Sequence, residues 1–413
     1  MKKLLSVLLV MTLIVSNVAM VCAADTTYVV KEGDTLAKIG EVYGVPYTII
    51  AQKNNIKDSN LIVVGQKLII PDKETASAPI ISSNLTIPTI AAAPTTPVST
   101  KVTVTDVTGR VITLDRSANK ILGTHNPSLN TGIVLGGGDK YIAGFGNKKM
   151  ANKLYDYVMK DYNGIVQIGT GSTINFETVA SLGKNNVAIL PERFKNQVEQ
   201  YENVGVKAVV ALPNTESFDT IKNSLTIVGK VLGEENRANK INTFIDKNIS
   251  EVKILAAKAN TRPSVIFLGS SNPQSVASTS MIQTDIIEMA GGTNAVKGLN
   301  VKGAFADVSI EQIIAWDPEI IWVPKYASYT VESLLNDAKW SSIKAVKNKA
   351  VYVFPSNLEP WDYPTASAVL GLCWGLNNLH PELYSKNDLM KNVDEFYELV
   401  YGMKFTAEQV GIK

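Results

Sequence analysis

Few side chains in this sequence could carry nucleophilic or metal-based chemistry. The 413 residues include only two cysteines and two histidines. Cys373 lies in the apolar stretch 369–379, and His380 follows that stretch directly. A cysteine nucleophile needs a histidine base beside it, but a buried helical cysteine and a histidine before Pro381 explain the pair more simply. The same scarcity excludes a disulfide scaffold, a zinc cluster of Cys and His, and a zinc amidase.

Two further kinds of chemistry depend on glycines and on carboxylates. The run Gly136-Gly137-Gly138 is not followed by Gly-Lys-Ser/Thr, so it predicts a turn that ends a helix, not a phosphate loop. A muramidase needs only a pair of carboxylates, and composition leaves that open.

Charge and composition narrow the class of protein. The 40 basic and 38 acidic residues leave a net charge of +2. Without a global positive field to hold a polyanion, we expect no nucleic-acid partner. A chain of this length with 45% hydrophobic residues has material for two or three packed domains.

Residues 1–24 have the three-part pattern of a secretory signal peptide. Two lysines precede an apolar run over 4–15, and small residues follow at Ala23 and Ala24. The run is too short for a permanent transmembrane helix. Cys22 leaves a lipoprotein open as an alternative, although no small residue directly precedes it. We therefore expect a secreted protein.

Residues 27–72 predict a small module of strand, helix, helix and strand. The first strand begins at Tyr28, helices follow near 35–43 and 48–53, and an apolar strand closes at Pro71. The following residues 73–100 are rich in Pro, Ala, Ser and Thr and predict a semi-rigid linker.

The small module closely resembles the LysM domain, which binds N-acetylglucosamine polymers in peptidoglycan and chitin. The resemblance rests on Tyr28-x-Val30, Gly33-Asp34-Thr35-Leu36, Asn54 and Gly65-Gln66-x-Leu68. It implies a glycan groove between two loops, with Gly33, Asp34 and Thr35 on one side and Asn55 and Ile56 on the other. The alternative is that Gly33 and Asp34 only form a turn and a helix cap, and the two roles are compatible.

Residues 101–413 predict an α/β fold of two Rossmann-like lobes. A β-hairpin over 102–114 is followed by apolar strands that alternate with helical stretches, first in 101–215 and again in 261–413. A long helical region over 216–260 lies between them, with Gly233 as a place where it could break. We expect this region to join the lobes as a single long helix.

A short sequence pattern that occurs once in each half supports two related lobes. Glu177 follows Asn175, and Glu311 follows Ser309, each two places after a capping residue at the start of a helix. A glutamate in a first turn also simply complements the helix dipole, by about 0.3–1 kcal/mol. Local physics alone favours this second explanation.

The whole segment 101–413 resembles the class III periplasmic binding proteins, which deliver iron–siderophore complexes, haem or vitamin B12 to ABC importers. The resemblance rests on the order of the hairpin, Glu177, the long helix and three later motifs: Met289-Ala-Gly-Gly-Thr-Asn294, Val308-Ser309-x-Glu311-Gln312 and Asp317-Pro318-Glu319. It implies that Glu177 and Glu311 dock onto permease arginines. One departure is Gly183-Lys-Asn-Asn186, where the family usually carries Pro-Asp.

The resemblance places the ligand in the cleft between the lobes, where strand ends and their loops converge. Aromatic faces and a few cations in those loops suit a flat or anionic chelate. His125 could ligate a haem or cobalt centre, and Trp361 and Tyr363 could instead pack the lobes together. Only five residues are arginine, so a pocket of clustered arginines is not expected. The candidate ligand-binding residues are His125, Asn126, Lys148, Arg193, Phe305, Trp361 and Tyr363.

These features favour a binding protein, not an enzyme, with no resident cofactor or metal. We expect a monomer that captures a metal chelate, partners an ABC permease and is held on peptidoglycan by the LysM module in place of a lipid anchor. The alternatives are a LysM-containing peptidoglycan hydrolase and a sensor that has lost transport.

Overall fold

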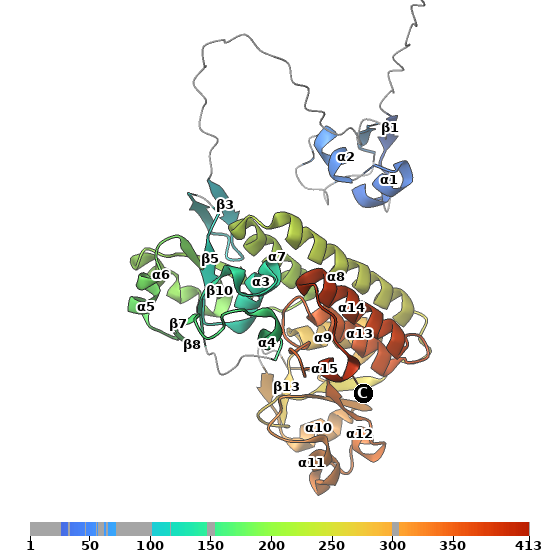
Figure 1. Ribbon diagram of the computed structural model, residues 1–413. Coiled ribbons are helices and arrows are strands. Elements are labelled where there is room, and N and C mark those ends of the chain that lie inside the picture. The colour runs from blue at the N-terminus through green and yellow to red at the C-terminus, as the bar shows by residue number, and fades with distance from the viewer. Residues whose placement is uncertain are drawn as a thin grey trace, which may run out of the picture. The chain divides into compact units, whose positions relative to one another are not determined.

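A computed structural model describes residues 26–31, 34–45, 47–54, 56, 62, 65–71, 101–115, 117–146, 153–299 and 305–412. The chain divides into two compact units, Met1–Thr96 and Pro97–Lys413 (Figure 1). Within the described residues, no helix is both long and apolar enough to cross a membrane.

The first unit has the predicted order of strand, helix, helix and strand. Its two strands pair antiparallel around a core that includes Leu36, Ile50 and Leu68. The Asn54 side chain donates to Ile50 O at 2.8 Å and to Ile69 O at 2.7 Å, so it joins the end of the second helix to the closing strand. The elements are β1 (Thr26–Val29), α1 (Leu36–Tyr43), α2 (Tyr47–Lys53) and β2 (Lys67–Ile70).

The second unit begins with the predicted hairpin and continues into a five-stranded parallel sheet. The strand order of that sheet is β11-β10-β5-β6-β7. The hairpin strands are β3 (Val102–Thr105) and β4 (Val111–Leu114). The sheet strands are β5 (Lys120–Leu122), β6 (Ile142–Phe145), β7 (Val166–Gln167), β10 (Asn186–Pro191) and β11 (Lys207–Leu212). The helices and short strands around them are α3 (Asn126–Gly136), η1 (Asp139–Tyr141), α4 (Tyr155–Val158), β8 (Gly169–Thr170), β9 (Thr173–Ile174), α5 (Phe176–Ser181), η3 (Glu192–Gln197) and α6 (Val198–Asn203).

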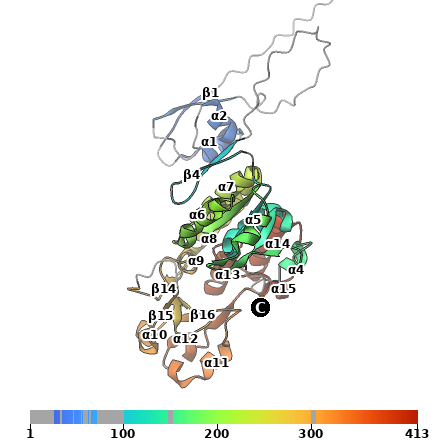
Figure 2. The same ribbon diagram turned by 90° about the vertical axis from the view of Figure 1, so that its left-hand side faces the viewer.

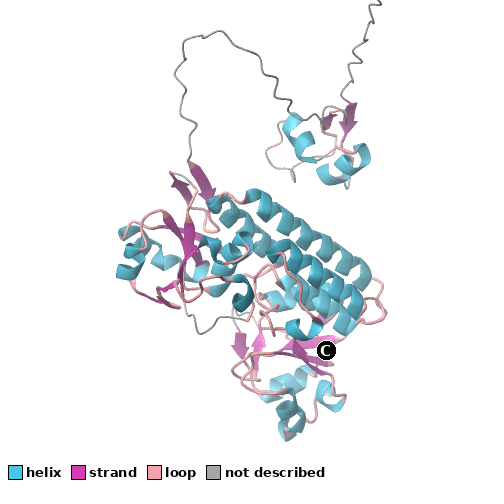
Figure 3. Ribbon diagram, viewed as in Figure 1, coloured by secondary structure: helices cyan, strands magenta, loops and turns pink. Residues whose placement is uncertain are grey.

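A second, four-stranded parallel sheet lies in the C-terminal lobe, and Figure 3 draws all strands in magenta. The strand order of this sheet is β14-β12-β16-β17. Its strands are β12 (Ser264–Phe267), β14 (Thr293–Asn294), β16 (Ile320–Pro324) and β17 (Val351–Phe354), and a separate ribbon pairs β13 (Ser275–Ala277) with β15 (Phe305–Asp307). The helices are α9 (Ile282–Met289), α10 (Ile310–Trp316), α11 (Val331–Asn336), η4 (Ala338–Trp340), α12 (Lys344–Lys347), α13 (Ala368–Leu379), α14 (Lys386–Tyr401) and α15 (Ala407–Val410).

Alternate residues of each parallel strand enter different hydrophobic cores, because successive side chains point to opposite faces. In β12, Val265 and Phe267 join the core that contains α13, whereas Ile266 joins the core beneath α10–α12. Helices accordingly cover both faces of this sheet, with α10, α11 and α12 on one side and α13 on the other (Figures 1 and 2). Both sheets are thereby buried on both faces, as expected for parallel strands.

The region between the lobes is two helices, not the single helix expected over 216–260. These are α7 (Phe218–Leu232) and α8 (Glu235–Ala256). Gly233 takes a left-handed conformation with φ of 71° and ends α7. The helices then run antiparallel, since Lys222 pairs with Asp246 at 2.6 Å while Asn242 donates to Lys222 O.

The longer helix α8 is the one that reaches both lobes. Near its start Arg237 donates to Val134 O of α3 and to Val400 O of α14. Farther along, the buried Asn248 contacts Cys373 of α13. The sequence allowed a break at Gly233, but it did not indicate that the chain turns back on itself there.

The predicted helix-ending turn at Gly136–Gly138 is confirmed. Gly137 caps α3 with φ of 65°, and Gly138 has φ of 141°. A β-carbon at Gly138 would lie 2.1 Å from the carbonyl oxygen of Val158. Only glycine fits this position without moving the backbone near α4.

We predict that Gly138→Ala lowers the free energy of unfolding by about 2 kcal/mol more than the control Gly109→Ala. Gly109 also has positive φ, of 84°, but nothing lies within 4 Å of an added β-carbon. The control therefore carries only the conformational cost, about 1 kcal/mol. Urea unfolding followed by circular dichroism would measure both, and equal losses would contradict the predicted clash.

Candidate functional site

The loops that follow strands of both sheets meet in one cleft. Thr124 and His125 come after β5, Arg193 after β10, Tyr326 after β16, and residues 356–365 after β17. The carboxyl ends of parallel strands lie at one edge of a sheet, so each lobe presents its loops to the other there. Two adjoining cavities result, which share Asn126, Pro127, Tyr326 and Tyr363.

The first cavity, here called the aromatic chamber, has a volume of about 420 Å³. Its walls combine rings with one cationic side chain, Arg193, and one carboxylate that is half-buried, Glu216. Its lining is Thr124, His125, Asn126, Pro127, Thr170, Gly171, Arg193, Phe194, Glu216, Met281, Gln283, Phe305, Tyr326, Asp362, Tyr363 and Pro364.

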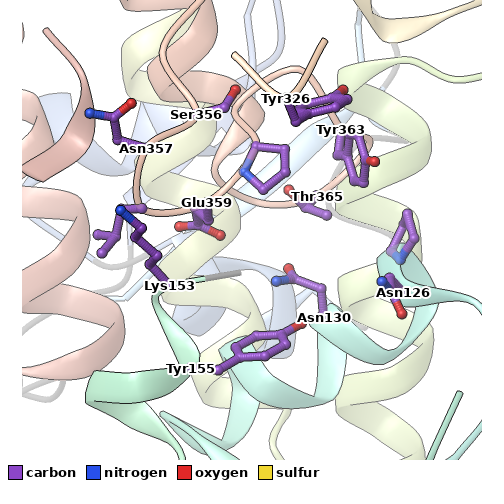
Figure 4. Close-up of a pocket in the computed structure, with 13 residues that line it drawn as sticks. Asn126, Asn130, Lys153, Tyr155, Tyr326, Ser356, Asn357, Glu359, Tyr363 and Thr365 are labelled. Atoms are coloured by element: carbon purple, nitrogen blue, oxygen red, sulfur yellow. The ribbon is translucent and has the colours of Figure 1, made fainter. Parts of the chain in front are cut away.

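The second cavity, the polar chamber, has a volume of about 350 Å³. Asn130 and Tyr155 rise into it from the N-terminal lobe, while Ser356, Asn357 and Glu359 come from the opposite lobe (Figure 4). Its lining is Asn126, Pro127, Asn130, Lys153, Tyr155, Tyr326, Ser356, Asn357, Leu358, Glu359, Pro360, Tyr363 and Thr365.

His125 and Arg193 form a hydrogen-bonded pair at the wall of the aromatic chamber. Arg193 donates to Nε2 of His125, so Nδ1 carries the ring hydrogen and donates to Ser128 Oγ at 2.9 Å. Burial and the neighbouring guanidinium hold the pKa of His125 well below its usual range. Both ring nitrogens are engaged, so a metal at Nε2 would have to displace Arg193. The described residues contain no group of three or more His, Cys, Asp or Glu side chains placed to hold a metal ion.

Two carboxyl groups at the cleft are wholly enclosed and hydrogen-bonded by tyrosines. Asp362 accepts from Tyr326 and from Ser356, and burial raises its pKa to about 6. Glu359 accepts from Tyr397 at 2.8 Å, and burial raises its pKa to about 7. Neither carboxyl has a lysine or arginine partner among the described residues.

Gln283 has a buried acceptor with no partner. Its amide nitrogen donates to the carbonyl oxygen of Asp362 at 2.8 Å, which fixes the orientation of the amide. The other atom, Oε1, is buried without a hydrogen bond from the described residues. The side chain is thus held by the bond to the Asp362 carbonyl, on the C-terminal lobe side of the aromatic chamber.

Most of the predicted ligand-binding residues come together in the cleft. His125, Asn126, Arg193, Phe305 and Tyr363 all line the aromatic chamber, though their predicted role in binding stays a prediction. Lys148 lies outside the described residues.

The prediction that Trp361 contacts the ligand is wrong, because Trp361 lines neither chamber. It is only 1% exposed, and its indole nitrogen donates to Tyr397 of α14 at 3.0 Å. The ring therefore packs the C-terminal lobe, which was the alternative considered for it.

Sequence reasoning missed Tyr326, Gln283, Glu216 and Lys153. Tyr326 follows β16 as Arg193 follows β10, so the rule applied to other strand ends could have found it. Gln283 and Glu216 lie at the starts of helices α9 and α7, where the sequence shows only capping patterns.

The predicted docking glutamates are exposed at helix starts. Glu177 follows the cap Asn175, whose side chain accepts from Thr178 N, and Glu311 follows Ser309, whose side chain accepts from Gln312 N. Hydrogen bonds at the helix start, from its own backbone and from Ser309, lower the pKa of Glu311.

In the small unit, Asp34 and Thr35 have structural partners. Asp34 accepts from Tyr28 at 2.6 Å and from Lys31 N at 2.8 Å, and Thr35 accepts from Lys38 N. Ile56 is half-buried against the core. Gly33 and Asn55 lie outside the described residues, so the predicted glycan-binding role of this loop pair stays a prediction.

We predict that Glu359→Gln flattens the pH dependence of stability. Because the pKa of Glu359 is raised to about 7, folding binds a proton between about pH 4.5 and pH 7. The free energy of unfolding therefore falls as the pH rises through this window, by on the order of 3 kcal/mol from this group. Gln keeps an acceptor for Tyr397 and removes the titration.

Urea unfolding at pH 5 and pH 8 would measure this difference. The exposed Glu199→Gln serves as the control and should keep the wild-type difference between the two pH values. An unchanged pH dependence in Glu359→Gln would show that this carboxyl does not cause it.

Comparisons with known proteins agree with this architecture. The model of the Periplasmic binding protein family matches residues 128–358, and the LysM domain model matches residues 28–71. Among solved structures, a periplasmic solute binding protein from Veillonella parvula has a TM-score of 0.65 and 25% identity, over 76% of this chain and 96% of that chain.

Two curated relatives are named for different ligands. The molybdate-binding protein MolA of Haemophilus influenzae is 24% identical over 325 residues, which cover 74% of this chain and 92% of MolA. The Fe(3+)-citrate-binding protein YfmC of Bacillus subtilis is 29% identical over 207 residues, 50% of this chain and 62% of YfmC. The chain belongs to the periplasmic binding protein family, as a class III substrate-binding protein of the ABC transporter type that carries a LysM domain ahead of its two lobes.

Proposed function

We propose that this protein captures an anionic metal chelate between its lobes and delivers it to an ABC permease outside the cytoplasm. The observation that carries the proposal is the aromatic chamber, where Arg193 stands among the rings of Phe194, Phe305 and Tyr363. A guanidinium in a partly apolar cavity attracts an anionic ligand strongly, because water screens the charge less there. The rings offer flat faces to the chelator.

A binding role, with no catalysis, fits the carboxyl groups at the cleft. A glycosidase needs one carboxylate free to attack or to activate water and one acid facing the scissile bond. Asp362 and Glu359 instead are enclosed and accept hydrogen bonds from tyrosines. We therefore propose a transport function ahead of a peptidoglycan hydrolase.

The LysM domain supports a place at the cell wall. Residues 28–71 match the LysM domain model, and peptidoglycan is the partner we propose for this domain. Attachment to peptidoglycan would keep the binding protein close to the membrane.

We predict that one class of chelate binds saturably at micromolar concentration or below. Titrations of the purified protein with ferric citrate, ferric hydroxamates, haem, cobalamin and molybdate would be followed by isothermal calorimetry. Arg193→Gln should weaken binding of the successful anionic ligand about tenfold or more. A folded protein that binds none of them would refute the proposed capture of a metal chelate.

We also predict that Glu177→Ala and Glu311→Ala each reduce transport without changing ligand affinity. Truncating one partner of a charge pair at an interface typically costs enough free energy for a tenfold effect or more. Uptake of radiolabelled ligand by cells that carry each variant in place of their own copy would measure it. Glu199→Ala, exposed on the N-terminal lobe with Glu177, is the control, and normal uptake by both variants would contradict the docking role of the two glutamates.

A further inference from the structure

The cleft contains two cationic side chains that lack a carboxylate partner, and they lie in different chambers. Arg193 lines the aromatic chamber and Lys153 lines the polar chamber. No described carboxylate lies within ion-pair distance of either one, although Glu216 and Asp362 line the aromatic chamber with Arg193 and Glu359 lines the polar chamber with Lys153. Arg193 donates only to the neutral ring of His125.

The two chambers adjoin and share four lining residues, but their other walls differ in chemical character. They meet at Asn126 and Pro127 on one lobe and at the edge-to-face rings of Tyr326 and Tyr363, 5.7 Å apart, on the other. Beyond this junction the aromatic chamber offers the rings of His125, Phe194 and Phe305 beside the charged groups Arg193, Glu216 and Asp362. The polar chamber offers the hydroxyl of Tyr155, the amide of Asn130 and the carboxyl of Glu359. If a ligand filled only one chamber, the other chamber would remain filled with water.

We propose that the ligand is a polycarboxylate metal chelate that spans both chambers, with one anionic end at Arg193 and a second at Lys153. This inference rests on the proposed function and names the substrate class of the same cleft. A single oxyanion is much smaller than either chamber, of about 420 and 350 Å³, and would occupy only one of them. A porphyrin ring would leave Asn130, Tyr155 and Glu359 facing an apolar surface, which costs free energy for each unpaired polar group.

The enclosed acid of the polar chamber is compatible with an anionic end there. Glu359 is enclosed and accepts from Tyr397, and burial raises its pKa to about 7, so it repels an anionic end less than an exposed glutamate would. Tyr155 lines the same space, and no hydrogen bond from its hydroxyl to a described residue competes with the ligand.

The test is calorimetric titration of the purified protein with ferric citrate at a fixed excess of citrate, with citrate alone as the blank. Lys153→Gln and Arg193→Gln should each weaken the affinity about tenfold, and the double variant about a hundredfold, since the two contacts are separate. Lys153→Arg should restore most of the affinity. Lys207→Gln, an exposed lysine on β11 outside both chambers, should leave it unchanged.

Three ligands without carboxylates at two ends serve as comparisons: molybdate, the ferric complex of desferrioxamine B, and haem, whose propionates share one edge. Each should bind at least tenfold more weakly than ferric citrate. Tighter binding of any of them, or a Lys153→Gln variant that behaves like Lys207→Gln, would overturn the two-chamber inference and leave the capture of a chelate standing. No binding by any probe, in protein shown to be folded, would overturn both.

Discussion

Double burial of the two parallel sheets is the constraint on which the rest of the large unit depends. Strands such as β10 are buried at every residue, so their polar backbone is satisfied only within the sheet and helices must cover both faces. The loops at the carboxyl ends are then the places where polar side chains can gather without disturbing the core. The cleft is lined by residues of these loops, among them His125, Arg193 and Tyr326.

The arginines of this protein differ in what they contact. Of the four arginines that the structure describes, Arg110 pairs with Asp106 and Glu202 and fastens the hairpin to the N-terminal lobe. Arg237 and Arg262 donate to backbone carbonyls and hold helices together. Arg193 alone in this set faces the cleft with only a neutral partner, which is why it carries the argument for an anionic ligand.

The sequence predicted the hairpin, the longer strands of both sheets and five of the residues that line the cleft, because each depends on local pattern. A continuous apolar run such as 187–190 can only be a buried strand or a buried helix, and its flanking loops follow from that. Trp361 was misplaced because its partner, Tyr397, lies 36 residues away on α14, and spacing does not reveal such a pairing. The reversal at Gly233 was equally invisible, since a left-handed glycine ends a helix without setting the direction of the next one.

The hydrophobic core that begins under β5 continues through α7 and α8 into α13 and α14 without interruption. Further contacts bind the lobes along the same side: Leu154 N donates to Leu358 O at 2.9 Å, and Tyr157 packs edge-on against Phe405. Swinging the lobes wide apart would expose apolar surface and break these bonds, so wide opening of the cleft costs free energy. A rearrangement of Tyr326, Tyr363 and their neighbours breaks none of these lobe contacts, so those side chains contribute to the residence time of a bound ligand.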